Sequence, residues 1–313
     1  MDLQIKLPED FLKEETRSDF LVTEERKKIW AISLDLLAQL DKICKKHHLT
    51  YYVFAGAALG AARHQGFIPW DDDIDVIMAR SEYEKLCKIA PKEFESPYFF
   101  QTNDTDFGAM WGHAKLRNSN TTCIARRDKK YERSINQGIF LDIFPADNVI
   151  DDEMLFNKQK RSAIIYRKAA KISAMATKGS LRSHSNKWVD SIYILWAFLF
   201  GPINRVIANF FWKKFELVCQ RYNDQETENF GLLSFQFSRK WIQRRDDYKK
   251  AVNLPFEFTT VPVCLNYEHS LSMLYGDWHK LVRGASQHEN FYYDTEHPYS
   301  EYFKRKKSQK SKF

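Results

Sequence analysis

Cysteines are few in this sequence, and they are not spaced as pairs. The five cysteines are scattered, with no Cys-x-x-Cys motif: Cys44, Cys87, Cys123, Cys219 and Cys264. A disulfide framework uses an even set of cysteines, and a structural zinc site uses closely spaced pairs. The sequence therefore argues against both, and we expect a reduced, intracellular protein.

An apolar run long enough to span a membrane is also missing. The run from Ile192 to Ile203 has about a dozen residues and is interrupted at Gly201-Pro202, whereas a spanning helix needs about 20. Two interpretations of residues 188–214 stay open. They form either a buried core helix or a hairpin-like insertion at the membrane interface, which the flanking basic residues favour: Lys187, Arg205, Lys213 and Lys214. The polar, partly acidic start of the chain predicts no signal peptide.

The charge balance is mildly basic. Lysine and arginine outnumber aspartate and glutamate by 48 to 41, and 44% of the residues are hydrophobic, which argues against global disorder. A basic surface suits nucleic acid, anionic lipid or a phosphorylated substrate. Part of the excess lies in residues 304–313, interpreted either as a solvated tail or as a contact with an anionic membrane. The remaining basic residues form no recognition motif, so we expect no nucleic-acid partner.

Helix-like and strand-like segments alternate through the first 150 residues. The predicted helices are 22–48 with Thr23 as its cap, 57–66, and one starting at a capping box of Ser81 and Glu84. The predicted strands are 50–56, 74–78, 98–102, 110–117 and 137–145, the last ending at Pro145. This order predicts an α/β (α+β) fold with a mixed sheet flanked by helices.

The predicted domain organisation follows from the change in pattern after residue 150. A catalytic core occupies residues 1–150, and a mainly helical region follows over 151–258. Residues 259–303 are expected to pack on the core, ahead of the basic tail.

The clearest chemical motif is GFIPWDDDIDVIM, residues 66–78, with four aspartates in five positions. Burying like charges is costly unless a partner compensates them. Alternate residues of a strand share a face, so Asp73 and Asp75 would point together, about 6–7 Å apart along the strand. Mg²⁺ takes hard oxygen ligands from carboxylates and substrate phosphates. We therefore expect a divalent ion there, with Asp71 and Asp72 as supporting ligands or as solvated turn residues.

A third carboxylate is expected on a later strand. Asp142 is the only charge in the apolar run GIFLDIFP, on the same face as Phe140 and Phe144. An isolated acid in such a run is rarely without function, although a capped structural aspartate is the alternative. An Asp-x-Asp pair after a strand–Gly–helix unit, followed by this aspartate, is the layout of the nucleotidyltransferase-type fold.

Four stretches carry a resemblance to a known family: GAALGAARHQGFIPWDDDIDVIM, HAKLR, GIFLDIFPADNV and VPVCLNYEHSLSMLYGDWHKL. The sequence resembles the LicD family of phosphotransferases, which includes fukutin and fukutin-related protein. The resemblance implies that Asp73, Asp75 and Asp142 bind Mg²⁺ or Mn²⁺, and that Gly56 lies close to the donor phosphates. Relatives often have Ser or Thr in the next position, where this chain has Ala57, so a hydroxyl contact to phosphate is lost.

The resemblance also implies a reaction. Family members move a phospho-alcohol, often phosphocholine, from a CDP-linked donor to a sugar hydroxyl of a cell-surface glycan or its lipid-linked precursor. Lipopolysaccharide, teichoic acid and capsule are such glycans. We therefore expect a cytoplasmic enzyme, peripheral on the inner face of the cell membrane.

Several further side chains are candidates for substrate binding. Arg63 and His64 could pair with phosphate or form structural contacts, and Lys115, with His113 on the same strand face, could face the donor phosphates. Trp70 and Trp111 could bind a quaternary ammonium group, although core packing is the alternative. Residues 275–281, YGDWHKL, are expected to help close the site.

Three other interpretations compete with the phosphotransferase. A glycosyltransferase could hold a UDP- or GDP-sugar with its Asp-x-Asp pair, but the Gly56 turn and Asp142 argue against it. A scaffold with a decayed site should have lost the acids. Nucleic-acid binding lacks a motif.

Overall fold

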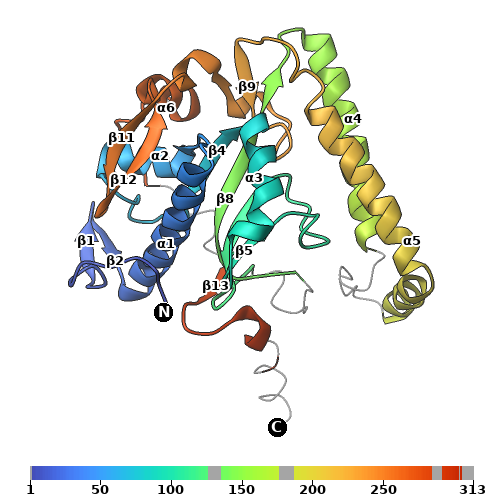
Figure 1. The fold of residues 1–313 in the computed structure, drawn as a ribbon, viewed down its shortest axis with the longest axis horizontal. Coiled ribbons are helices and arrows are strands. Elements are labelled where there is room, and N and C mark those ends of the chain that lie inside the picture. Colours follow the sequence, from blue (N-terminus) through green and yellow to red (C-terminus); the bar gives the residue numbers. More distant parts are fainter. Residues whose placement is uncertain (1, 126–134, 176–186, 284–290, 303, 305–313) are drawn as a thin grey trace.

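A seven-stranded mixed sheet organises the computed structural model (Figure 1). The structure describes all residues except 1, 126–134, 176–186, 284–290, 303 and 305–313, so the predicted basic tail lies almost entirely outside the described residues. The strands of the sheet are β3 (Tyr52–Phe54), β4 (Asp75–Ala79), β5 (Tyr98–Gln101), β6 (Ala114–Asn118), β8 (Ile139–Val149), β9 (Asn229–Gly231) and β10 (Ile242–Arg244). The predicted α/β class with a mixed sheet is confirmed.

The long strand β8 is the centre of the sheet. On one edge it pairs in parallel with β4, which in turn pairs antiparallel with β3. On its other edge β8 pairs antiparallel with β6 over Ile139–Ile143 and with β9 over Asp147–Val149. Strands from three distant parts of the sequence thus meet around one strand.

The prediction that this strand ends at Pro145 is wrong. β8 continues through Pro145 to Val149. A proline lacks the N–H that a ladder needs, but Pro145 lies in the gap between the stretch paired with β6 and the stretch paired with β9. No donor is required on that edge, so the strand passes through.

Three helices lie next to the central strands: α1 (Glu24–Lys46), α2 (Ala55–His64) and α3 (Arg80–Glu93). Thr23 caps α1 by accepting a hydrogen bond from the Arg26 N–H, as predicted. The predicted capping box of α3 is wrong. The helix begins at Arg80, directly after β4, and its N-cap residue Ala79 makes no side-chain cap.

The remaining described elements cover the edges of the core. Two short ladders pair β1 (Glu15–Arg17) with β2 (Phe20–Val22), and β11 (Ala251–Phe256) with β12 (Thr259–Cys264). A third ladder pairs β7 (Thr122–Ala125) with β13 (Phe291–Asp294). The short helices are η2 (Arg239–Trp241), η3 (Arg245–Tyr248) and α6 (Tyr267–Tyr275).

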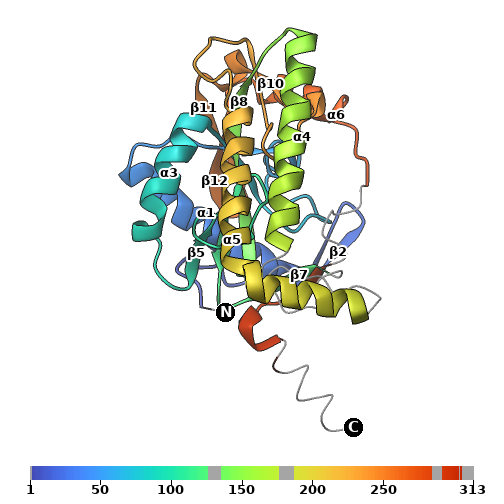
Figure 2. The same ribbon diagram turned by 90° about the vertical axis from the view of Figure 1, so that its right-hand side faces the viewer.

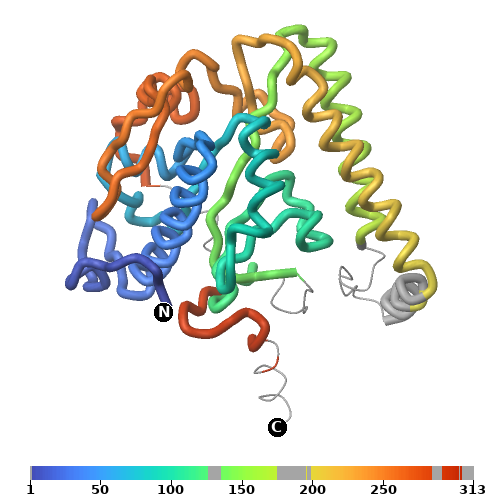
Figure 3. The backbone as a smooth tube through the Cα atoms, in the orientation of Figure 1, coloured from blue at the N-terminus to red at the C-terminus, as the bar shows by residue number. Residues whose placement is uncertain are grey.

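Two long helices, α4 (Glu153–Met175) and α5 (Lys187–Cys219), lie along one edge of the molecule. The later part of α5 lies beside α4, whereas its first part turns away at a wide angle (Figures 1 and 2). The helical character predicted from residue 151 is thus observed as far as Cys219, and α5 continues through Pro202. Residues 229–244 then return to the core sheet as β9 and β10. Figure 3 shows the backbone of the two helices as an arm beside the sheet. No described helix is both long enough and apolar enough to cross a membrane.

Apolar packing divides into a main core and a smaller one. The main core joins α1 to the sheet and includes Trp30, Leu36 and Ile74, which are almost completely buried. The smaller core lies between α4 and α5 and includes Ala163, Ala208 and Phe215. All five cysteines are free, in agreement with the predicted lack of disulfides.

Candidate active site

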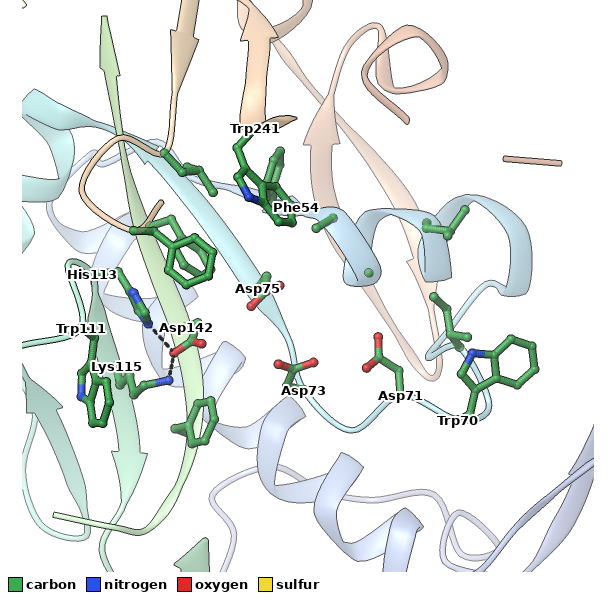
Figure 4. A pocket seen from close by; sticks show the side chains of 18 of the residues that line it. Phe54, Trp70, Asp71, Asp73, Asp75, Trp111, His113, Lys115, Asp142 and Trp241 are labelled. Atoms are coloured by element: carbon green, nitrogen blue, oxygen red, sulfur yellow. Dashed lines mark hydrogen bonds and ion pairs between the residues drawn. The ribbon is translucent and has the colours of Figure 1, made fainter. Parts of the chain in front are cut away.

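Three charged side chains stand in one row across three neighbouring strands. Asp75 at the start of β4 is the ladder partner of Asp142 in β8, and Asp142 is in turn the ladder partner of Lys115 in β6. Ladder partners lie about 5 Å apart, so their side chains meet when they emerge on the same face. Figure 4 shows this row at the wall of a cavity.

The carboxylates predicted to act together do converge. Oxygen atoms of Asp73, Asp75 and Asp142 lie within 4.8 Å of one another, and those of Asp71, Asp72 and Asp73 form a second such group. Asp73 lies before the strand, so its position depends on the loop and not on strand alternation. A set of carboxylate oxygens is the donor set that Mg²⁺ and Mn²⁺ prefer, and these residues therefore fit such an ion.

The electrostatics of Asp75 agree with that fit. Burial, followed by repulsion from Asp73 and Asp142, raises its pKa well above the ordinary value. A carboxyl in this position holds its negative charge only at a cost, and a positive ion among the three carboxylates would offset that cost.

Asp142 lies close to two basic side chains as well as to the acids. The Lys115 ammonium group donates to its Oδ1, and His113 Nε2 lies 3.3 Å from the same oxygen (Figure 4). Burial raises the pKa of Asp142, but Lys115 and His113 outweigh burial and lower it overall. Asp142 is therefore an ionised carboxylate at neutral pH. Neither ring nitrogen of His113 has hydrogen-bond geometry to a described residue.

The turn from β3 into α2 forms another part of the cavity wall. Ala55 has a left-handed backbone, with φ of 48°, which is uncommon for a residue other than glycine. A Cβ at Gly56 would lie 2.6 Å from Asp71 Oδ2, so a side chain at this position would push the Asp71 carboxylate aside. The first N–H groups of a helix attract anions, and Ala55 and Gly56 both line the cavity. Ala57 packs in the main core.

The other predicted binding residues divide into those that reach the cavity and one that does not. Arg63, Trp70 and Trp111 line it. The Arg63 guanidinium donates to the backbone oxygens of Trp278 and Lys280, so it holds the C-terminal motif in place. His64 does not line the cavity that the described residues form.

His64 instead lies against Trp70. Burial and the nearby Arg63 lower its pKa to about 4, so its ring is neutral at physiological pH. A neutral, partly buried ring fits the structural role that the sequence left open for His64.

The C-terminal motif reaches the site as predicted. Tyr275, Asp277, Trp278 and Lys280 line the cavity opposite the aspartates, which lie about 200 residues earlier in the chain. The cavity has a volume of about 640 Å³, within the range of small-molecule sites.

An aromatic wall above Asp75 was not predicted from the sequence. It consists of Phe54 from β3, Phe144 from β8, and Phe235 and Trp241 from the segment around β9 and β10. The rings of Phe235 and Trp241 lie 6.1 Å apart, and those of Phe144 and Phe235 lie 5.0 Å apart. Phe54 and Phe144 lie within two residues of predicted site positions, but no sequence motif marks the other two.

Carboxylates on adjacent strands, beside a strand–Gly–helix turn in a mixed sheet, have the layout expected of a nucleotidyltransferase-type fold. Residues 48–177 match the family model described as LicD/FKTN/FKRP, nucleotidyltransferase domain. The family resemblance indicated by the sequence motifs is confirmed.

Individual relatives agree with this assignment. The lipopolysaccharide cholinephosphotransferase LicD of Haemophilus influenzae is 26% identical over 258 residues, which are 80% of this chain and 89% of that protein. Uncharacterised proteins of Rickettsia prowazekii and Rickettsia typhi are 36% and 32% identical over 63 and 74 residues. The chain spans only about a quarter of the length of each of these two proteins.

Proposed function

We propose that this protein is a metal-dependent phosphotransferase that moves a phospho-alcohol from a CDP-linked donor to a sugar hydroxyl. The convergence of Asp73, Asp75 and Asp142 beside the start of α2 carries this proposal. Phosphoryl transfer needs positioning and charge neutralisation more than covalent chemistry, and this site offers groups for both.

The residues would divide the work as follows. Asp73, Asp75 and Asp142 would hold Mg²⁺ or Mn²⁺, and a bound ion supplies positive charge against the donor pyrophosphate. The N–H groups at the start of α2, next to Gly56, would bind phosphate oxygens. Lys115 orients Asp142 through its ion pair. A direct contact of Lys115 or Arg63 with the donor stays a prediction.

The transfer itself needs one proton acceptor. The sugar oxygen bonds to the phosphorus that carries the alcohol, the bond from that phosphorus to CMP breaks, and the hydroxyl proton passes to a carboxylate. We propose Asp142 as that acceptor, because its carboxylate lines the cavity and its ion pair with Lys115 keeps it ionised.

The aromatic wall favours phosphocholine as the transferred group. Choline carries a quaternary ammonium group, which aromatic faces bind through cation–π interactions. Trp241 and Phe235 are only partly buried, so their rings are available to a ligand in the cavity. The name of the Haemophilus influenzae relative, a lipopolysaccharide cholinephosphotransferase, supports the same alcohol and a cell-surface glycan as acceptor. We further propose that the protein works at the inner face of the cell membrane, where a lipid-linked precursor is accessible.

Thermal stability with candidate donors tests the proposal without knowledge of the acceptor, because a ligand that binds the native state raises the melting temperature. CDP-choline, CDP-ethanolamine, CDP-ribitol, CDP-glycerol and UDP- or GDP-sugars would be compared with and without Mg²⁺ or Mn²⁺. We expect a metal-dependent rise with CDP-choline that is lost in Asp73→Asn and kept in the exposed control Asp224→Asn. A rise with nucleotide sugars alone would instead establish the glycosyltransferase.

The role of Asp142 needs a turnover measurement. Asp142→Asn keeps the shape of the side chain but cannot accept the proton. It should abolish transfer of labelled phosphocholine and weaken the donor-induced melting shift less than Asp73→Asn does, because Lys115 already pairs with the Asp142 carboxylate. Turnover at the wild-type rate would remove Asp142 from the reaction.

A further inference from the structure

An exposed apolar stripe runs along α5. Its members recur at helical spacing, and each is more than half exposed: Leu195, Leu199, Ile203, Val206, Phe210 and Leu217. Within the later part of α5, residues spaced by three or four positions share one helix face, as Ile203, Val206, Phe210 and Leu217 do. The buried residues of the helix, such as Ala208, Trp212 and Phe215, occupy the opposite face. The stripe is therefore turned away from the core, and the buried-helix interpretation of residues 188–214 is wrong for these side chains.

The neighbouring helix α4 carries a second stripe of the same kind. Met154, Ile165 and Ile172 are exposed by 76%, 64% and 68%. They lie opposite the buried residues Phe156 and Ala163 of their own helix. Figure 2 views both helices from the side away from the sheet. Together they form what we term the hairpin face, a surface larger than scattered apolar residues usually make.

The charge of the hairpin differs sharply from that of the rest of the chain. Residues 153–219 contain twelve lysines and arginines and three acidic residues, Glu153, Asp190 and Glu216, an excess of nine positive charges. The whole chain has an excess of seven, so everything outside these residues is net negative. Arg161, Lys168 and Lys213 are exposed and share the helix faces of the two stripes.

We infer that the hairpin face docks on the surface of a bilayer rich in anionic lipid. Helices with an apolar stripe and basic residues bind in the plane of the membrane interface, where each basic residue contributes about 1 kcal/mol. A second copy of this chain would bring two strongly positive faces together, which opposes pairing. Nucleic acid would satisfy the charges but leave the apolar stripes exposed to water.

The hairpin face is linked to the candidate active site. Arg167, on α4, donates through Nη1 to the backbone oxygen of Phe235 and through Nη2 to that of Trp111, at 2.6 and 2.9 Å. Both of these residues line the cavity. Docking would therefore hold the cavity at a defined distance from the bilayer. The docking proposal extends the proposed location at the inner face of the cell membrane, but it does not depend on the proposed phosphotransfer reaction.

Sedimentation of the full chain with vesicles tests the inference. The probes are vesicles of phosphatidylcholine alone and of equal parts phosphatidylcholine and phosphatidylglycerol. We expect binding to the anionic vesicles only, weakened by salt. The triple variant Leu199→Ser/Val206→Ser/Leu217→Ser and the variant Arg161→Gln/Lys168→Gln/Lys213→Gln should each bind at least about tenfold more weakly.

Matched controls separate the contribution of the hairpin face from that of exposed residues elsewhere. Leu21→Ser/Leu265→Ser/Met273→Ser removes exposed apolar side chains outside this face and should bind as the wild type does. Glutamine in place of the lysines and arginine of residues 304–313 tests the tail. Binding lost in that tail variant alone, binding unchanged in both hairpin variants, or a dimer that the triple variant abolishes would overturn the inference. The melting shift with CDP-choline should persist in the hairpin variants, so failure of docking and failure of the proposed reaction are distinguishable.

Discussion

Lys115 lies directly across from Asp142 in the antiparallel pair of β6 and β8, and its ammonium group contacts the Asp142 carboxylate. Both residues are only 7% exposed, so the pair is shielded from water. A buried carboxylate beside two other acids keeps its place only with such a partner. Lys115 is thereby assigned to the carboxylate cluster as well as to the cavity wall.

Replacement of Lys115 should separate orientation of Asp142 from contact with the donor. Lys115→Met removes the partner of Asp142, and we expect kcat to fall by about 10–100-fold because the carboxylate loses its fixed orientation. Steady-state kinetics with CDP-choline would measure the change in kcat. Lys115→Arg is the conservative variant, and Lys42→Met, at an exposed position, is the control. A rise in the donor KM at unchanged kcat would instead indicate direct binding of the donor phosphates.

A side chain at Gly56 should displace the Asp71 carboxylate. In Gly56→Ala the new Cβ would meet Asp71 Oδ2 at 2.6 Å, so the carboxylate has to leave its position. We expect turnover to fall by about 100-fold, because displacement of a group by about 1 Å has that effect on a positioned site. Gly201→Ala is a matched control, since a Cβ there meets nothing within 4 Å. Equal activity of both variants would show that the close approach of α2 to Asp71 is unimportant.

Trp241 should discriminate between alcohols. A cation–π contact contributes about 0.5–2 kcal/mol, so Trp241→Leu should lower kcat/KM for CDP-choline by about 2–30-fold, with a smaller effect on CDP-ethanolamine. Trp241→Phe keeps an aromatic face and should retain most of the preference. Trp70→Leu, measured in parallel, tests the tryptophan that the sequence suggested. A preference lost there and kept in Trp241→Leu would move the choline site to Trp70.

Glu216 on α5 should make stability depend on pH. Burial raises its pKa to about 7, against 4.5 for an unperturbed glutamate, although Arg80 lowers it in part. The folded state therefore binds the proton more tightly than the unfolded state does. The contribution of Glu216 to the free energy of unfolding is therefore fully present below about pH 4.5. It falls by about 3 kcal/mol as the pH rises through 7.

Glu216→Gln should remove this loss. Its melting temperature should exceed that of the wild type at pH 8, and the difference should shrink toward pH 4.5. Glu226→Gln, at an exposed position, should show no such trend. A wild-type pH profile in Glu216→Gln would contradict the prediction.

Sequence periodicity predicted local elements well where one physical signal dominated. The helix after Thr23 has a cap, an acidic first turn and an apolar stripe, and all three agree with α1. Pro145 and Ser81 misled the prediction because each was judged by its own chemistry. At Pro145 the adjacent strands leave a gap in the ladder, so the strand continues. At Ser81 the helix has already begun, because β4 leads directly into it at Arg80.

The amino-acid sequence by itself determined the acidic cluster and the family that the chain resembles. Four aspartates in five positions and an isolated Asp142 require compensation wherever they are buried, and this requirement holds before any fold is known. Only the tertiary structure placed Lys115 opposite Asp142, joined Phe235 and Trp241 to Phe54 and Phe144, and turned the apolar stripe of α5 outward. Sheet register, cavity walls and helix orientation depend on contacts between residues far apart in the chain, and local pattern carries no information about those contacts.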